Sequence, residues 1–401
     1  MLRKRSAFMA LLLAFALIAA ACSDDDSSDT TTSPPATAAP DTAAPDTAAP
    51  ETTPPETTPP VTGAPVAAPK LCEITDVGGI DDASFNESAW VGAQQAEAEY
   101  GSEISFLESN VEADYRPNID SLIDEGCDLV ITVGFTLAAA TAQAAVDNPD
   151  QKFAIVDQSF FPGEPWTDAD GNDLSGNGYF NVRGLVFQTD EAGFLAGYLA
   201  AAYTETGVVG TFGGVNIPPV TIFMDGFAWG VDYYNEVNGT SVVVLGWDPV
   251  AAEGLFTNNF ESLEDGASFA QSLVDEGADI VLPVAGPVGL GSAAVCQDTG
   301  ACVMIGVDAD QFFTAPNFAD VWLTSIQKNI AEAIFSTATN LVEIGALGNL
   351  YNGTLANGGV GLAPEHDVAW PEGIAAELAD IEAGIIDGSI LINTVDRNAE
   401  E

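Results

Sequence analysis

From residue 70 onward, the chain alternates between short apolar runs and longer stretches with apolar residues at helical spacing. The runs stand at 71–75, 104–108, 208–212, 242–245 and 321–326, with alanine-rich or amphipathic stretches between them. A short run that is apolar throughout is typical of a parallel strand buried on both faces, and the stretches between such runs predict helices. The pattern therefore predicts an α/β fold.

Part of this pattern occurs twice. Residues 121–130, Ser-Leu-Ile-Asp-Glu-Gly-Cys-Asp-Leu-Val, match residues 272–281, Ser-Leu-Val-Asp-Glu-Gly-Ala-Asp-Ile-Val, at an offset of 151 positions. The same offset joins residues 153–157 to residues 304–308, so the match covers two consecutive strands. Each copy reads as a helix that ends at a glycine and is followed by a buried strand.

The repeat predicts two similar doubly wound parallel-sheet lobes joined by a hinge, because residues 70–401 exceed what one hydrophobic core usually serves. Lobe 1 would span about 70–190 together with returning C-terminal segments, and lobe 2 about 205–320. Ligands of such sheets collect at the carboxyl ends of the strands. We therefore expect the ligand in the cleft between the lobes.

The first residues follow a different pattern. Residues 1–22 read as a basic start, an apolar run too short to span a bilayer, three alanines and Cys22, which is the layout of a secretory signal. The segment resembles the lipobox of bacterial lipoproteins, although Ala19 stands where a larger aliphatic residue is usual. We predict that Cys22 is lipidated. The alternative is ordinary signal cleavage that leaves Cys22 as a spare thiol.

Residues 23–69 consist almost entirely of Asp, Glu, Ser, Thr, Pro and Ala. Such a composition has little apolar surface to bury, so the segment is predicted to be a disordered stalk. A coil of this length reaches on the order of 40 Å, and farther where prolines extend it. The stalk would hold the domain formed by residues 70–401 away from the membrane surface.

Charge narrows the choice of ligand. The chain carries 60 acidic and 9 basic residues, and three of the basic ones lie in the leader, so the net charge without it is about −54. Such a field repels nucleic acid, acidic lipid and phosphorylated ligands. Neutral or cationic small molecules are therefore expected, and nucleic acid is not expected as a partner.

Four cysteines follow the leader, and an exported chain favours disulfides over zinc. Three pairings are possible. Cys296 and Cys302 flank a short loop, while Cys72 and Cys127 each begin an apolar strand, which favours pairing within these two couples. A zinc site is the weaker interpretation of these cysteines, because no Cys-x-x-Cys spacing occurs and His366 is the sole histidine. Loop 168–173 departs from a calcium-binding loop and is taken as a turn, so neither a metal nor a cofactor is predicted.

Three predicted strands are followed directly by a carboxylate, at Asp76, Asp157 and Asp308, and the last two are related by the repeat. Ionised carboxylates only accept hydrogen bonds, so several that converge on one cleft suit a ligand rich in hydroxyl groups. The alternative is that each aspartate merely starts a turn after a strand. Lys328 follows the strand at 321–326 and could donate to the same ligand, or lie at the surface.

The loop after the first strand leads into a helix. Ser84 and Glu87 have the spacing of a capping box, which places Phe85 and Asn86 in the first helical turn, above the strand ends. An aromatic ring at that place is suited to cover a flat ligand, and an amide beside it can read the edge of a heterocycle. Alternatively, Phe85 fills the core of its lobe.

Five segments carry a family resemblance: 75–90 (Thr-Asp-Val-Gly-Gly-Ile-Asp-Asp-Ala-Ser-Phe-Asn-Glu-Ser-Ala-Trp), 187–200, 283–286, 305–310 and 323–328. Together they resemble the basic membrane protein family over nearly all of residues 70–328. The resemblance implies a substrate-binding lipoprotein of an ABC importer with the type I periplasmic binding fold, held on the extracytoplasmic side of the cell membrane. It implies a permease and an ATPase as partners, and PnrA-like members bind purine nucleosides.

The resemblance also implies roles for single residues. Phe85 would stack on the base while Asn86 reads its edge, and a second ring would come from Phe260 ahead of Gly266, with Phe256 as the alternative. Ribose would be held by the remaining polar groups, which are Asp76, Asp157, Asp308, the backbone of Gly286, and Lys328.

Two other functions are compatible with parts of the sequence. Residues 76–82 resemble the aspartate cluster of nucleoside hydrolases, but Thr75 and Val77 depart from that motif and no histidine is near it. Histidine-dependent catalytic triads lack parts as well. A non-enzymatic binding protein is therefore predicted. A surface sensor, or a binding protein for another small polar ligand such as a sugar, would share the fold and the anchor.

Overall fold

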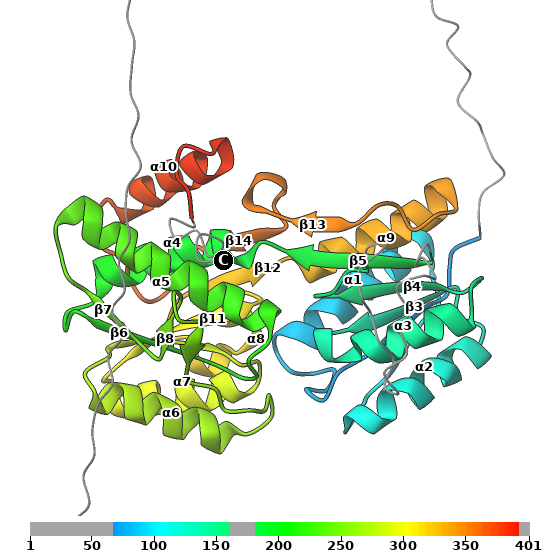
Figure 1. Ribbon diagram of the computed structural model, residues 1–401, viewed down its shortest axis with the longest axis horizontal. Helices are drawn as coiled ribbons and strands as arrows, with labels where there is room; N and C mark the ends of the chain where they lie inside the picture. The colour runs from blue at the N-terminus through cyan, green and yellow to red at the C-terminus, as the bar shows by residue number, and fades with distance from the viewer. Residues whose placement is uncertain (1–66, 161–180, 393–401) are drawn as a thin grey trace, which may run out of the picture. The chain divides into compact units, whose positions relative to one another are not determined.

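The computed structural model describes residues 67–160 and 181–392. The predicted leader with Cys22, nearly all of the stalk and loop 168–173 lie outside these residues. The described part contains two six-stranded sheets, each covered by helices (Figure 1). None of the helices in these two stretches is both long and apolar enough to cross a membrane.

Lobe 1 is built on an all-parallel sheet with the strand order β2-β1-β3-β4-β5-β13. Its strands are β1 (Leu71–Ile74), β2 (Ile104–Leu107), β3 (Leu129–Val133), β4 (Lys152–Val156), β5 (Val182–Phe187) and β13 (Tyr351–Gly353). Helices α1 (Phe85–Tyr100) and α9 (Ile330–Ile344) pack together, as do α2 (Tyr115–Asp124) and α3 (Ala138–Asp147). Alternate residues of β1 contribute to two separate cores, Leu71 to one and Cys72 and Ile74 to the other, so the sheet is buried on both faces.

Lobe 2 repeats this order as β7-β6-β10-β11-β12-β14, with only the edge strand β14 antiparallel. Its strands are β6 (Val208–Gly213), β7 (Val243–Leu245), β10 (Ile280–Val284), β11 (Val303–Asp308), β12 (Trp322–Lys328) and β14 (Val360–Leu362). Its helices are α4 (Thr189–Tyr203), α5 (Pro218–Asn238), α6 (Leu263–Asp275), α7 (Val288–Thr299), α8 (Gln311–Thr314) and α10 (Ile374–Asp387). A small hairpin, β8 (Trp247–Asp248) and β9 (Glu253–Gly254), completes the lobe.

The internal repeat and the predicted fold are confirmed. The repeated segments form α2, β3 and β4 in lobe 1 and α6, β10 and β11 in lobe 2, at equivalent places in the two sheets. Gly126 and Gly277 follow the two repeated helices in left-handed conformations, with φ of 75° and 104°. That conformation reverses the chain into the next strand without a Cβ clash.

The chain crosses between the lobes three times. It passes from β5 to α4 at Gln188, from β12 to α9 at Asn329, and from β13 to β14 through residues 354–359. Helix α4 packs on α5, β12 and β14, so it belongs to lobe 2. Lobe 2 is therefore larger than the predicted 205–320, because α4, all of β12, β14 and α10 lie within it. Of the returning C-terminal segments, only α9 and β13 belong to lobe 1.

Glycines bring α4 and α5 into close contact. A Cβ on Gly197 would lie 2.0 Å from the carbonyl oxygen of Phe227, and one on Gly230 would lie 2.0 Å from that of Phe194. Such separations exclude any side chain, so the two helices meet backbone to backbone. This contact helps to fix α5, whose first turns contribute Val220 and Phe223 to the cleft between the lobes.

Both predicted disulfides are present. Cys72 and Cys127 join β1 to the turn before β3 across 55 positions, and Cys296 and Cys302 join the end of α7 to the start of β11 across six. Each disulfide therefore lies near the amino ends of the strands of its sheet. The cleft lies at the carboxyl ends of these strands, so both disulfides are remote from it.

Candidate functional site

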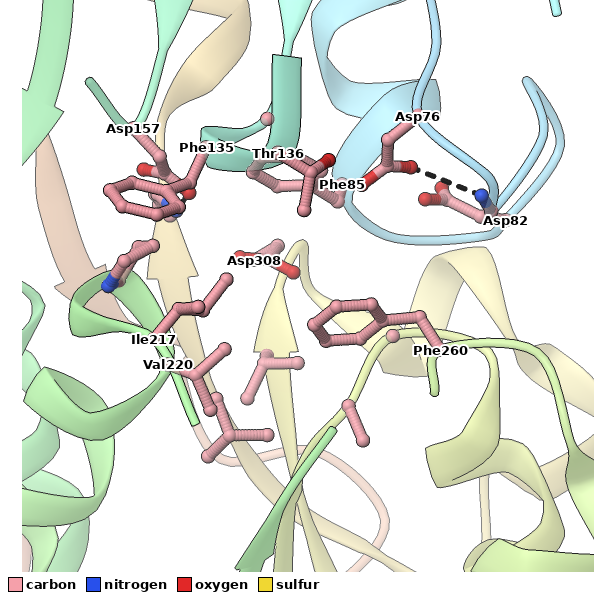
Figure 2. Close-up of a pocket in the computed structure, with 18 of the residues that line it drawn as sticks. Asp76, Asp82, Phe85, Phe135, Thr136, Asp157, Ile217, Val220, Phe260 and Asp308 are labelled. Atoms are coloured by element: carbon pink, nitrogen blue, oxygen red, sulfur yellow. Dashed lines mark hydrogen bonds and ion pairs between the residues drawn. The ribbon is translucent and has the colours of Figure 1, made fainter. Parts of the chain in front are cut away.

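A cavity of about 600 Å³, part of it open to solvent, lies between the lobes at the carboxyl ends of β1, β3 and β4 and of β10, β11 and β12 (Figure 2). Seven of the eight residues predicted to bind a ligand line it, and Asn86 does not. The lining residues are Asp76, Gly78, Asp82, Phe85, Gly134, Phe135, Thr136, Asp157, Ile217, Pro219, Val220, Phe223, Phe260, Val284, Ala285, Gly286, Pro287, Val307, Asp308 and Lys328.

Asp157 and Asp308, the aspartates related by the repeat, occupy equivalent places. Asp157 follows β4 and Asp308 ends β11, and both have the left-handed backbone conformation, with φ of 67° and 65°. A non-glycine residue in that region is uncommon and carries some strain, for which aspartate is among the better tolerated residues. The shared conformation turns both carboxylates into the cavity, one from each lobe.

Lys328 is the cation of this cavity. Its Nζ lies 2.5 Å from Asp157 Oδ2, and both side chains are almost fully buried. Three aromatic rings also surround the ammonium group, with centroids 4.8 Å away for Phe85, 5.4 Å for Phe187 and 5.7 Å for Phe223. The π faces of such rings stabilise a desolvated cation. The lysine is thus held by one carboxylate and three rings, inside the site rather than at the surface.

The capping box predicted for Ser84 and Glu87 is wrong. Ser84 precedes α1, but its hydroxyl makes no hydrogen bond to the helix. Asp82 caps α1 instead, because its carboxylate accepts hydrogen bonds from the backbone N–H groups of Asn86 at 2.8 Å and Glu87 at 3.1 Å, as well as from Ser84 N at 2.9 Å. The Ser84 hydroxyl is thereby left to donate to Asp308 Oδ2 at 2.8 Å, across the cleft.

Asn86 lies beneath the cavity wall, only 1% exposed. Its amide nitrogen donates to Asp76 Oδ1 at 2.8 Å and to Asp82 Oδ2 at 3.1 Å. Gly78 N adds a further hydrogen bond to Asp76 Oδ1 at 3.0 Å. The structure thus places Asn86 where it orients Asp76, not where it would touch the edge of a ligand.

Phe85 and Phe260 present their rings to the cavity from different lobes, Phe85 from the start of α1 and Phe260 from the segment before α6 (Figure 2). Phe256 does not line the cavity; its ring packs edge-on against Trp247, 5.9 Å between centroids. The geometry therefore favours Phe260 over Phe256 as the ring available to a ligand.

Several lining residues were not found from the sequence. Phe135 and Thr136 lie in a single 3₁₀ turn (Phe135–Leu137) directly after β3. Their place after a buried strand was the available signal, since the aspartates were identified in that way. Ile217, Val220 and Phe223 stand at and after the start of α5, where their helical spacing is equally typical of core residues.

Burial governs the ionisation of the cavity acids. It raises the pKa of Asp157 to about 6, an effect that Lys328 opposes and that Asp308 and Asp76 reinforce. Burial also raises the pKa of Asp308, against the opposing effects of Lys328 and of the hydrogen bond from Ser84. The pKa of Asp76 is raised for the same reason, and the hydrogen bonds from Asn86 and Gly78 oppose the increase.

Hydrogen bonds join the two lobes beside the cavity. Besides the Ser84–Asp308 contact, Thr314 Oγ1 on α8 donates to the carbonyl oxygen of Ala83 at 2.6 Å. Ala83 itself has a left-handed conformation, with φ of 58°. The loop before α1 therefore contacts lobe 2 both at the end of β11 and at α8.

Residues 67–160 and 181–392 contain neither a metal-binding group of side chains nor a catalytic triad built on histidine. These residues contain no group of three or more histidine, cysteine or acidic side chains placed to hold a metal ion. His366 does not line the cavity; it pairs with Asp310 at 2.8 Å and stacks on Phe312, 4.1 Å between ring centroids.

A family model described as "ABC transporter substrate-binding protein PnrA-like" matches residues 70–392. The chain belongs to this Bmp family. The resemblance inferred from the five segments is thereby confirmed, and Basic membrane protein A of Borreliella burgdorferi is 30% identical over 327 residues, 81% of this chain and 87% of that protein. A lipoprotein of Pyrococcus furiosus is 29% identical over 301 residues, 73% of this chain and 69% of that protein.

Among solved structures, a solute-binding protein of an ABC transporter system from Aeropyrum pernix superposes with a TM-score of 0.67 at 24% identity. The match covers 82% of this chain and 95% of that one. It shows that this Bmp family member has the two-lobed solute-binding fold. The cavity described above therefore lies between the two lobes of a member of a family of ABC transporter substrate-binding proteins.

Proposed function

We propose that this Bmp family member binds a nucleoside, with the base between Phe85 and Phe260 and the ribose among Asp76, Asp157 and Asp308. The observation that carries the proposal is the pairing, in one cavity, of aromatic rings from both lobes with several carboxylates and a single buried lysine. A nucleoside has a flat apolar part and a hydroxyl-rich part. The cavity provides the matching surfaces for each.

The polar half of the cavity suits ribose. Ionised Asp76, Asp157 and Asp308 accept hydrogen bonds from hydroxyl groups, and Lys328 donates. Gly286, in a left-handed conformation with φ of 54°, lines the cavity on the side of lobe 2, next to Asp308 and Lys328 in the sheet order. A phosphate group would meet these carboxylates and a net charge of about −54 on the mature chain, so nucleotides are expected to bind much more weakly than nucleosides.

We further propose that lipid on Cys22 tethers the protein to the outer side of the cell membrane and that it delivers its ligand to an ABC permease driven by an ATPase. The signal layout before Cys22, the membership in a family of ABC transporter substrate-binding proteins and the likeness to the Pyrococcus lipoprotein support this. Mass spectrometry of the mature N-terminus would detect the lipid. An unmodified Cys22 would remove the tether from the proposal.

Calorimetry over purine and pyrimidine nucleosides, free bases, sugars and nucleotides tests the ligand class. Phe85→Ala should weaken nucleoside binding roughly 5- to 150-fold, the effect of losing one stacking ring. Asp308→Ala should weaken it by a similar factor, since a hydrogen bond to a charged group contributes about 1.5–3 kcal/mol. Phe313→Ala is a matched control, because Phe313 is 68% exposed and lies outside the cavity wall.

Near-native affinity in both cavity variants would refute the assignment of the site. Tighter binding of a sugar than of any nucleoside would replace the ligand class. Incubation with inosine distinguishes the remaining alternative, since steady release of free base would show a hydrolase and not a binding protein.

A further inference from the structure

The ring of Phe260 lies directly on a glycine. A Cβ built on Gly214, the residue after β6, would lie 2.2 Å from Cε1 and 2.4 Å from Cδ1 of that ring, and 3.0 Å from the carbonyl oxygen of Asn259. Non-bonded carbon atoms approach optimally at about 3.5–4.0 Å. No residue with a side chain can therefore occupy position 214 while Phe260 keeps its present place in the cavity.

The backbone on both sides of Phe260 is anchored. Before the ring, Asn258 N donates to the Gly214 carbonyl oxygen at 2.7 Å, and Thr257 N donates to that of Gly213 at 3.0 Å. After it, the side-chain oxygen of Asn259 accepts from Glu261 N at 3.1 Å and from Ser262 N at 2.8 Å, leading into α6. These hydrogen bonds hold the backbone around Phe260 in place. A side chain at position 214 would therefore displace the ring by rotating its side-chain torsions, and not by moving the backbone.

The neighbouring glycine shows the same arrangement with a different result. A Cβ on Gly213 would lie 2.6 Å from Cε1 of Phe256, whose ring points to Trp247 and not into the cavity. Two successive glycines, the last residue of β6 and the residue after it, therefore each pack against one aromatic ring. Only the ring on Gly214 reaches the ligand cavity.

We propose that Gly214 is a positioning residue for ligand binding, which fixes the ring of Phe260 in the plane required for stacking. The inference rests on the proposed function, in which Phe260 stacks on a nucleoside base. Gly214 is not among the residues with positive φ, so alanine is compatible with its backbone. A substitution there acts mainly through the contact with the ring, since the Asn259 carbonyl oxygen is the farther of the two neighbours and the φ angle of position 214 is compatible with alanine.

A double-mutant cycle tests this role. Gly214→Ala, Phe260→Ala and the double variant are compared with the wild type by calorimetry with adenosine and inosine and by thermal unfolding without ligand. We expect Gly214→Ala alone to weaken binding by about 10-fold or more, approaching the loss caused by Phe260→Ala. In the Phe260→Ala background, Gly214→Ala should have only a small further effect, because the ring is gone and the Asn259 carbonyl oxygen, 3.0 Å from the new Cβ, needs to move by only a few tenths of an ångström.

Gly361→Ala is the matched control, since Gly361 also lies outside the positive-φ region and a Cβ there has only Gln327 Oε1 nearby, at 3.9 Å. It should bind and unfold like the wild type. Wild-type affinity in Gly214→Ala would overturn the proposal, as would an equal loss from Gly214→Ala with and without the Phe260 ring. If Gly214→Ala alone does not fold, the double variant should fold and bind like Phe260→Ala; failure of the double variant to do so refutes the coupling.

Failure of the proposed function gives a different result. If the wild type binds no nucleoside, the function is wrong, but the two positions should still be coupled in unfolding temperature. Binding of nucleoside by the wild type without any coupling in either measurement would instead refute the role of Gly214 alone.

Discussion

Replacing Lys328 by methionine should make the stability of the fold strongly dependent on pH. The substitution keeps an unbranched apolar side chain near the rings of Phe85, Phe187 and Phe223, but it removes the cation 2.5 Å from Asp157. Removing one partner of a buried ion pair costs about 3–5 kcal/mol when the other charge is left unpaired. We expect a loss of that size in the free energy of unfolding at pH 8.

The loss should shrink as the pH falls. Burial already raises the pKa of Asp157 to about 6 although Lys328 opposes the increase, and without the lysine this pKa rises further. A carboxyl group whose pKa is higher in the folded than in the unfolded state stabilises the fold increasingly as the pH falls through the folded-state pKa. At pH 5 Asp157 is protonated in the variant, and the remaining loss should be about 1 kcal/mol, from the missing cation–π contacts.

Urea unfolding of both proteins from pH 5 to pH 8, at constant ionic strength, measures this difference. Lys152→Met is the control, because Lys152 begins β4, the strand that leads to Asp157, yet forms no ion pair within the described ranges 67–160 and 181–392. Its effect should stay small and nearly constant with pH. A loss of unfolding free energy in Lys328→Met that did not change with pH, or that grew toward pH 5, would refute this reasoning. Either result would show that Lys328 does not stabilise the ionised form of Asp157.

Two further predictions concern the ligand and the disulfides. Nucleoside affinity should fall by up to about 10-fold per pH unit below about 6, because protonation of Asp157 weakens it as an acceptor for ribose hydroxyls. Protonation of Asp308, whose pKa is also raised, should make the fall steeper; constant affinity in calorimetry from pH 8 to 5 would contradict this. Replacing Cys72 and Cys127 by serine should lower the free energy of unfolding by about 4 kcal/mol, against about 2 kcal/mol for the disulfide that spans six positions, since the longer loop constrains the unfolded chain more. Equal losses in urea unfolding would refute the loop-length argument.

The two lobes could be predicted because their signals are local and repeated. The helix–strand units ending at Gly126 and Gly277 and the strands before Asp157 and Asp308 are legible without any knowledge of tertiary contacts. Strands β13 and β14 are three residues each and were not predicted. They exist because they pair with edges formed by distant strands, so no property of the segments themselves identifies them.

The site shows the same division. The strand-end aspartates and Phe85 could be placed from the sequence because a parallel sheet brings its carboxyl ends together. The sequence does not predict whether Ser84 or Asp82 caps α1, because both residue types cap helices. The choice depends on Asp308, which approaches Ser84 from the other lobe. The burial of Asn86 under Asp76 likewise depends on contacts that spacing does not encode.

The three crossings between the lobes also bear on how the chain folds. Residues 351–362 supply the last strand of each sheet, so neither sheet is complete until that segment is in place. Lobe 1 further needs α9, which follows the whole of lobe 2 up to β12. An N-terminal fragment ending before residue 351 would thus leave the longer strands β5 and β12 as sheet edges in place of the short strands β13 and β14, which favours aggregation. Successful folding of this chain therefore depends on a late segment that completes both halves together.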